Sequence, residues 1–432
     1  MRQPPRPVAA EPAATIPAMT QIHTATLPTG LTLLGEQIPA AQSLSMSLLT
    51  PAGLAQQPDD QQGVATLLEE MICRGAGGLS AREHSEALDR LGVRRSTSVE
   101  TRHMRLSATM IGEKLPDALP LLLDMIRRPN LDAEALEPAR LLSLQSLDAL
   151  DDEPQQRVML ELKRRHFPAP FDRSPFGRRD ALTRLSLADV RAFWKRTAVP
   201  GESVLAFAGH FDWDELKAHV SELVGDWTGP GEEPAVSETP PRGYEHLTQD
   251  TAQVHIALAY DAPPEPDPQA PLQRAATAVL SGGMSGRLFT EVREKRGLCY
   301  AVGASYVGQR DRGAVFCYAG TTAPRAQETL DVVSHELHRL SEGVEPGEFD
   351  RAIVGMKSRL VMQGESTAAR ARAIAHDQVT LGHPRSLDER RGEVDAITLQ
   401  TLNAYVRDNP PGRMTIVTLG PTALSVEAQA AS

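Results

Sequence analysis

The chain has little of several features on which common protein functions depend. Its 432 residues include only three cysteines, which are too few and too scattered for a disulfide framework or a cysteine-based zinc site. Aromatic residues make up 4% of the chain, which argues against base-stacking platforms. The net charge of −11 argues against nucleic acid as the main partner. No apolar run approaches the length of a membrane span, so we expect no membrane insertion.

The first residues also lack the apolar core of a secretory signal. The run MRQPPRPVAAEPAATIPAM is rich in proline and alanine, and Glu11 interrupts it. We therefore interpret residues 1–21 as a flexible arm and expect a cytoplasmic location.

The chain as a whole has the composition of an ordinary globular protein, with 41% hydrophobic and 23% charged residues. Its length predicts two or more domains. Strand-like runs and helical periodicities are mixed without regular alternation, which favours an α+β fold over a doubly wound sheet. Residues 229–243, GPGEEPAVSETPPRG, are rich in Pro, Gly and Glu and predict a linker.

The two sides of this linker resemble each other. GGLSAREHSEALDRLG at 77–92 aligns with GGMSGRLFTEVREKRG at 282–297, and SLADVRAFWKR at 186–196 aligns with TLQTLNAYVRD at 398–408. Both matches occur in the same order with similar offsets, which predicts a duplicated domain.

The expected organisation is therefore a pair of similar α+β domains, each a mainly antiparallel sheet packed with helices. The predicted domains are residues 22–228 and residues 244–424, and residues 425–432 form a tail.

The segment SGGMSGRLFTEVREKRGLCY, residues 281–300, is the most informative one. A glycine-rich turn leads into a charged helix, which ends at Gly297 before a strand-like run. Arg293 and Tyr300 flank this break, and together they are donors for a carbonyl, a carboxylate or a phosphate. The residues alone leave an alternative open, in which Arg293 pairs with Glu291 or Glu294 and Tyr300 is a core strand residue.

With its duplication and this segment, the chain resembles the pitrilysin, insulin-degrading enzyme and mitochondrial processing peptidase family of zinc peptidases. The run SPFGRRDALTRLSLADVRAFWKRTAVPGESVLAFAGHFDWDEL at 174–216 is similar to the end of that family's first domain. The resemblance extends over roughly residues 22–422 and implies a clam-shell architecture in which two such chains enclose a chamber.

The resemblance also implies an inverted zinc box, His-x-x-Glu-His, which this chain lacks. The matching run is GVATLLEEM at 63–71, with Thr66 and Glu70 at the two histidine positions and Glu69 at the general-base position. The third ligand position falls on Ser146. Hydroxyl groups are poor zinc ligands, so we expect no zinc in this chain. Glu69 and Glu70 alternatively have no catalytic role, because Leu67, Leu68 and Met71 would pack inward.

No histidine supplies a replacement box. His335 and His338 lie three residues apart, in VSHELHRL, and His84 lies on a helical pattern at 81–91. We interpret all three as surface residues.

The chain does retain the residues that match the other part of the family's active site, an arginine and a tyrosine. The resemblance implies that Arg293 and Tyr300 reach across to the substrate near the scissile bond and stabilise its oxyanion. It also implies that Gly282 and Gly283 lie along the substrate path. The alternative for the two glycines is a plain turn before a helix, with Ser285 near the cap.

We therefore expect a non-zinc subunit of a heterodimeric zinc peptidase. The partner would be a homologous chain with the zinc box, and the substrate a peptide, such as the precursor of pyrroloquinoline quinone. Two alternatives stay open: a structural scaffold like the core proteins of a respiratory complex, and a peptide-binding homodimer without peptidase activity.

Overall fold

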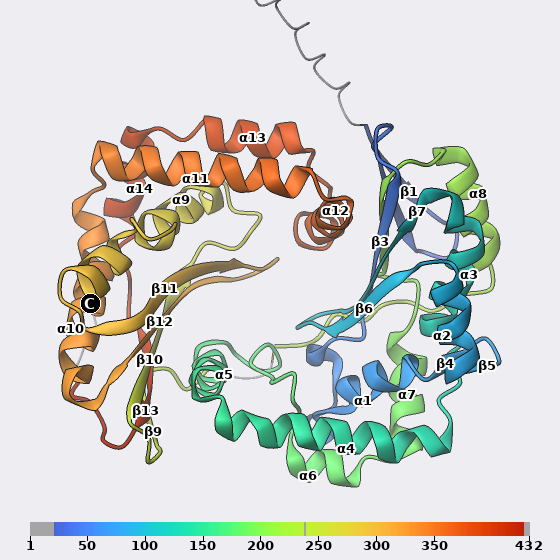
Figure 1. The fold of residues 1–432 in the computed structure, drawn as a ribbon, viewed down its shortest axis with the longest axis horizontal. Helices are drawn as coiled ribbons and strands as arrows, with labels where there is room; N and C mark the ends of the chain where they lie inside the picture. Colours follow the sequence, from blue (N-terminus) through green and yellow to red (C-terminus); the bar gives the residue numbers. More distant parts are fainter. Residues whose placement is uncertain (1–20, 237–238, 427–432) are drawn as a thin grey trace, which may run out of the picture.

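The computed structural model describes residues 21–236 and 239–426, which form two sheets with helices packed against each (Figure 1). Residues 1–20 of the predicted arm and residues 427–432 of the predicted tail lie outside the described residues. In the predicted linker, the described residues 229–236 and 239–243 form neither helix nor strand.

The first sheet has six strands. In spatial order they are β1 (Ile22–Thr26), β2 (Thr32–Gln37), β8 (Val204–Gly209), β3 (Ser43–Thr50), β7 (Met104–Ile111) and β6 (Arg94–Val99). All neighbours are antiparallel except β2 and β8. A short hairpin of β4 (Gly75–Ala76) and β5 (Leu79–Ser80) lies apart from this sheet.

The second sheet has five strands. In spatial order they are β11 (Cys299–Gly308), β12 (Gly313–Thr322), β10 (Gln253–Ala262), β13 (Thr415–Gly420) and β9 (Tyr244–Thr248). Only the pair of β13 and β9 is parallel.

The two sheets have the same topology. From its β9 end, the second sheet runs β9-β13-β10-β12-β11, and the first sheet from β2 onward runs β2-β8-β3-β7-β6. Each strand of one series occupies the same place in chain order as its counterpart in the other. The predicted α+β fold with duplicated, mainly antiparallel domains is confirmed.

The helices follow the same repeat, except that α8 has no counterpart among the described residues of the second half. Those of the first half are α1 (Val64–Ile72), α2 (Ala81–Arg90), α3 (Leu115–Arg127), α4 (Ala133–Ala149), α5 (Pro154–His166), α6 (Arg179–Arg184), α7 (Leu187–Thr197) and α8 (Trp213–Val224). Those of the second are α9 (Ala270–Ser281), the π-helix η5 (Phe289–Glu294), α10 (Ala326–Arg339), α11 (Pro346–Gly364), α12 (Thr367–Leu381), α13 (Leu387–Asp395) and α14 (Leu399–Asp408). Within the described ranges, no helix is long and apolar enough to cross a membrane.

The two halves exchange one helix each (Figure 1). Helix α5 belongs to the first half in sequence but packs on β10 and β13 of the second sheet. Its buried Val158 and Leu162 share a hydrophobic cluster with Phe316 and Val417. Burial of this apolar face, at roughly 25 cal/mol per Å², ties α5 to the second half.

Helix α12 makes the reciprocal contact. It belongs to the second half and packs on β3 and β8 of the first sheet, where Ile374 and Ala375 meet Leu49 and Val204. This interface also contains a buried ion pair between Arg370 of α12 and Glu36 of β2. The distance from Arg370 Nε to Glu36 Oε2 is 3.0 Å.

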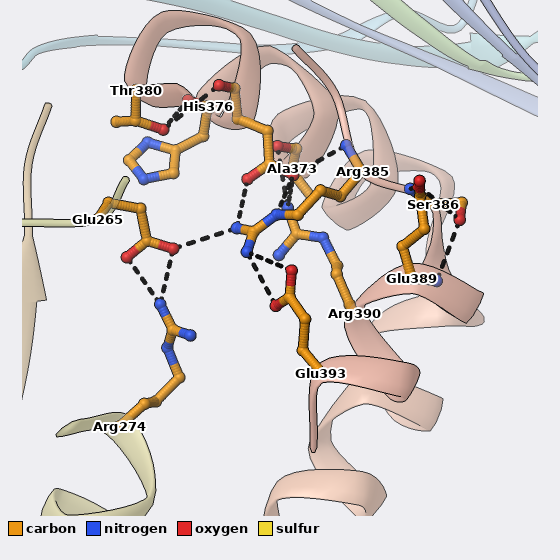
Figure 2. Close-up of polar contacts among 11 residues, drawn as sticks. Glu265, Arg274, Ala373, His376, Thr380, Arg385, Ser386, Glu389, Arg390 and Glu393 are labelled. Atoms are coloured by element: carbon orange, nitrogen blue, oxygen red, sulfur yellow. Dashed lines mark hydrogen bonds and ion pairs between the residues drawn. The ribbon is translucent and has the colours of Figure 1, made fainter. Parts of the chain in front are cut away.

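A buried arginine joins α12 to its own half (Figure 2). Arg385 lies between α12 and α13, and its guanidinium donates to Asp377 at 2.9 Å, to Glu265 at 3.1 Å and to Glu393 at 2.9 Å. Asp377 is completely buried, and Glu265 also accepts from Arg274 at 2.7 Å. These charges hold the end of the exchanged helix beside the loop that follows β10.

Candidate functional site

Arg293 and Tyr300 lie on either side of one tight chain reversal. The helix that carries Arg293 has the wide hydrogen-bonding pattern of a π-helix over Phe289–Glu294. It ends in a turn closed by hydrogen bonds from Gly297 N to Arg293 O and from Leu298 N to Val292 O, each 3.0 Å. Gly297 has a φ of +59°, a conformation that glycine adopts without strain. The buried Val292 and Leu298 anchor the reversal.

The Arg293 guanidinium is exposed and lies 5.0 Å from the centre of the Phe289 ring. Its acidic neighbour Glu291 pairs instead with Lys295 at 2.7 Å and Arg296 at 2.9 Å. Across the part of the chain that the structure describes, Arg293 forms no ion pair. The alternative in which Glu291 or Glu294 neutralises Arg293 is therefore wrong, and the cation faces solvent.

Tyr300 projects from an irregularity in the sheet. The register of β11 on β12 shifts between Cys299 and Ala301, so Tyr300 is the extra residue of a β-bulge. Its side chain is 43% exposed, and its hydroxyl donates to Gln253 Oε1 at 2.6 Å. The alternative of a buried core residue is therefore wrong for Tyr300.

Gly282 and Gly283 form an exposed turn between α9 and the helix that begins at Arg287. Gly286 N donates to Gly283 O at 3.0 Å, and the adjacent Met284 is 76% exposed. Within the described chain, Ser285 makes no capping hydrogen bond to the following helix. The two glycines thus lie in the same exposed loop that leads to Arg293, and their substrate contact stays a prediction.

The residues at the zinc-box positions lie on α1 and are already engaged. The Thr66 hydroxyl donates to the carbonyl of Pro175 at 2.7 Å. Glu69 accepts a short hydrogen bond from the Thr97 hydroxyl on β6, and Glu70 pairs at 3.8 Å with Arg74, which lies two residues beyond the end of the helix. The neighbouring leucines and Met71 are buried, as the helical pattern of α1 predicts.

The carboxyl group of Glu69 has a shifted pKa. Its half-buried position raises the pKa of Glu69, and the adjacent Glu70 raises it further, whereas the hydrogen bond from Thr97 lowers it. Ser146 lies on α4, which packs along α1, but its side chain is exposed.

These residues do not fit a zinc ion. Catalytic zinc sites use three protein ligands drawn from histidine, cysteine, aspartate and glutamate. The three ligand positions hold the hydroxyl groups of Thr66 and Ser146 and the carboxylate of Glu70. The Thr66 hydroxyl is hydrogen-bonded to a backbone carbonyl, and Glu70 is paired with an arginine. No group of three such ligands that could hold a metal occurs in residues 21–236 and 239–426.

The structure keeps the two sets of predicted residues in separate halves. Helix α1 packs against α4, α7 and β6 of the first half, whereas η5 packs against β11 and α10 of the second. For the described residues, no hydrogen bond or ion pair links Arg293 or Tyr300 to α1. Among the described residues, the Arg/Tyr pair therefore lies apart from the zinc-box positions and has no metal-ligand set beside it.

Two of the three histidines lie at the surface and one is buried. His335 and His338 are exposed on α10, as predicted. The prediction that His84 lies at the surface is wrong, because its side chain is 1% exposed and its Nε2 lies 3.0 Å from the carbonyl oxygen of Leu121. An amphipathic helix predicts only which residues share a face, and His84 shares its face with the buried Leu88.

The sequence also did not point to the residues that surround Tyr300. Gln253, His255, Tyr318 and Gly320 come from β10 and β12, far from Tyr300 in sequence. The pairing register of β10, β12 and β11 brings them together, and no local pattern encodes that register.

Comparison with known proteins agrees with this fold. Residues 32–171 match the model of the insulinase family, peptidase family M16, and residues 184–356 match the model described as the peptidase M16 inactive domain. The chain belongs to the M16 peptidase family.

Relatives from several bacteria are named as zinc proteases. An uncharacterized zinc protease of Mycobacterium tuberculosis is 27% identical over 426 residues, covering 96% of each chain. The uncharacterized zinc protease YmxG of Bacillus subtilis is 25% identical over 382 residues, covering 88% of this chain and 93% of YmxG.

Two crystal structures share the fold. One is a peptidase M16 inactive domain from Pseudomonas fluorescens, with a TM-score of 0.83 and 23% identity over 94% of this chain and 99% of that one. The other is a protease from Helicobacter pylori, with a TM-score of 0.84 and 17% identity over 93% of this chain and 100% of that one.

Proposed function

We propose that this chain is the zinc-free subunit of a two-chain zinc peptidase, and that Arg293 and Tyr300 complete an active site whose metal the partner holds. The proposal rests on one combination of features. Arg293 and Tyr300 are exposed and Arg293 forms no ion pair in the described residues, whereas the residues at the zinc-box positions do not fit zinc. Membership of a peptidase family supplies the chemical context.

The two side chains suit the electrostatic demands of peptide cleavage. A tetrahedral intermediate places negative charge on the former carbonyl oxygen, and fixed donors stabilise that charge. Arg293 offers a permanent cation with a planar set of N–H donors, and Tyr300 offers a neutral O–H donor. The Tyr300 hydroxyl donates its hydrogen bond to Gln253 in this structure, so a substrate carbonyl would replace Gln253 as the acceptor.

The partner would be a homologous chain with the His-x-x-Glu-His helix that this chain lacks. It would supply zinc, the metal ligands and the general base. A peptide substrate would lie between the two chains, within reach of both sets of side chains.

The test compares this chain alone, the candidate partner alone and the two together, with zinc content and cleavage of a quenched fluorescent peptide as the readouts. We expect zinc-dependent cleavage only by the complex, with the metal bound to the partner. Zinc-dependent cleavage by this chain alone would refute the proposal, as would an active partner whose rate this chain does not change.

Substitution of Arg293 tests its role within the complex. Removal of one oxyanion donor from a peptidase site lowers kcat about 10²–10³-fold, and we expect Arg293→Ala to fall in that range. Arg296→Ala is the matched control, because Arg296 is exposed three residues further along and contacts Glu291. Equal activity of the two variants would remove Arg293 from the site.

A further inference from the structure

The side chain of Tyr300 lies across a neighbouring strand at a glycine. Tyr300 is on β11 and its hydrogen-bond acceptor Gln253 is on β10, with β12 between the two strands. The crossing point is Gly320, which pairs with Ala301 on one side and with His255 on the other. A Cβ atom at position 320 would lie 2.5 Å from both Cζ and Oη of Tyr300. Any larger residue would therefore displace the ring.

A buried tyrosine faces the same point. Tyr318 lies two residues before Gly320 on β12, hence on the same face of the sheet, and its hydroxyl would lie 2.8 Å from that Cβ atom. The Tyr318 hydroxyl also lies 2.8 Å from Nδ1 of the buried His255. Burial of its hydroxyl, followed by the nearby Tyr300 hydroxyl, holds the pKa of Tyr318 well above its usual range.

The donors and acceptors of these groups form one consistent series. If His255 donates from Nδ1 to the Tyr318 hydroxyl, that hydroxyl is free to donate toward Tyr300, whose own O–H donates to Gln253. Each hydroxyl then donates once and accepts once. This tautomer leaves His255 Nε2 as a buried acceptor without a partner in the described residues, instead of a buried donor without one. Burial lowers the pKa of His255, which favours the neutral ring that the series requires.

We propose that Gly320, Tyr318 and His255 are positioning residues that fix the direction of the Tyr300 hydroxyl for the substrate carbonyl. The inference rests on the proposed function for its chemistry, but the placement of Tyr300 can be measured without a partner. Gly320 supplies the space under the ring, Tyr318 orients the hydroxyl from below, and His255 orients Tyr318.

The placement test uses ¹⁹F NMR of this chain with 3-fluorotyrosine at its six tyrosines. The Tyr300 resonance is assigned by its loss in Tyr300→Phe. We expect Gly320→Ala and Tyr318→Phe each to shift the Tyr300 resonance by more than its linewidth. Gly355→Ala is the control, because the added Cβ on α11 would lie within 4 Å of no atom beyond its own stretch of helix. An unmoved Tyr300 resonance in both variants would overturn the proposal, and Tyr318→Phe keeps the ring and serves if Gly320→Ala does not fold.

The activity test uses the complex with the zinc-bearing chain. We expect Gly320→Ala to lower kcat about tenfold or more with little change in KM, and the double variant Gly320→Ala/Tyr300→Phe to be no slower than Tyr300→Phe alone. Additive losses would show that Gly320 does not act through Tyr300 and would overturn the proposal. A complex that is inactive with wild-type chains would refute the proposed function, while the NMR result still decides the placement of Tyr300.

Discussion

The exposure of Arg293 and Tyr300 depends on two local departures from regular backbone geometry. A π-helical turn carries Arg293, and a β-bulge carries Tyr300. Both kinds of irregularity occur preferentially at functional sites, because each redirects a side chain that regular geometry would place elsewhere. The residue types alone predicted a donor pair, but the backbone around them gives the pair its exposure.

Glu69 provides a prediction about stability and pH. Because burial raises its pKa above the ordinary value of 4.5, the folded protein binds this proton more tightly than the unfolded chain does. The free energy of unfolding contributed by Glu69 therefore falls as the pH rises from 4.5 through the folded pKa, and stays low above it. We expect Glu69→Gln to gain stability relative to the wild type as the pH rises from 4.5 to 8.

Urea denaturation of both proteins between pH 4.5 and pH 8 measures this difference. The Gln side chain keeps an oxygen that accepts from Thr97, so the comparison isolates the charge. Stability curves that stay parallel over the whole range would contradict the prediction.

At the scale of elements, Arg385 is the residue on which the end of α12 depends (Figure 2). Removal of one partner from a buried ion network leaves an uncompensated charge and costs about 3–5 kcal/mol. We expect Arg385→Ala to lose stability at or below the lower end of that range, because Asp377 is fully buried beside it but keeps its ion pair with Arg390 at 2.6 Å. The measurement is the midpoint and slope of urea unfolding.

The matched control for this variant is Arg391→Ala on α13. Arg391 is 68% exposed and pairs with Asp395 at 3.8 Å, so its loss should cost less than about 0.5 kcal/mol. Similar losses for the two variants would show that the buried network does not stabilise the junction of α12 and α13.

The sequence predicts where these helices lie along the chain, but not which sheet each of them covers. Helical periodicity at about 155–165 and 367–381 in the sequence predicts α5 and α12, because apolar residues such as Leu162 and Ile374 recur at helical spacing. It did not predict that each helix packs on the sheet of the other half, because the choice of sheet depends on contacts distant in sequence. The sequence predicts the donor pair because Arg293 and Tyr300 are only seven residues apart. It does not predict that Gln253 and Gly320 lie beside Tyr300, because strand register brings these distant residues together.

For the whole molecule, the exchange of helices predicts the behaviour of a cut chain. If a specific protease site is inserted within residues 229–243 and cleaved, we expect the two fragments to co-elute in size-exclusion chromatography and to separate only in denaturant. Helices α5 and α12 would each remain packed on the other fragment. Leu162→Asp, which places a charge in the buried face of α5, should weaken this association. Fragments that separate without denaturant would contradict the prediction.

The reciprocal packing of α5 and α12 also bears on how such a chain arose. One copy of the repeat, taken alone, would leave part of its sheet bare and would carry a helix with no surface to cover. Two copies satisfy each other, as protomers do in a domain-swapped dimer. A single copy of the repeat would therefore need a second copy to cover its sheet, and joining two copies in one chain makes that pairing intramolecular.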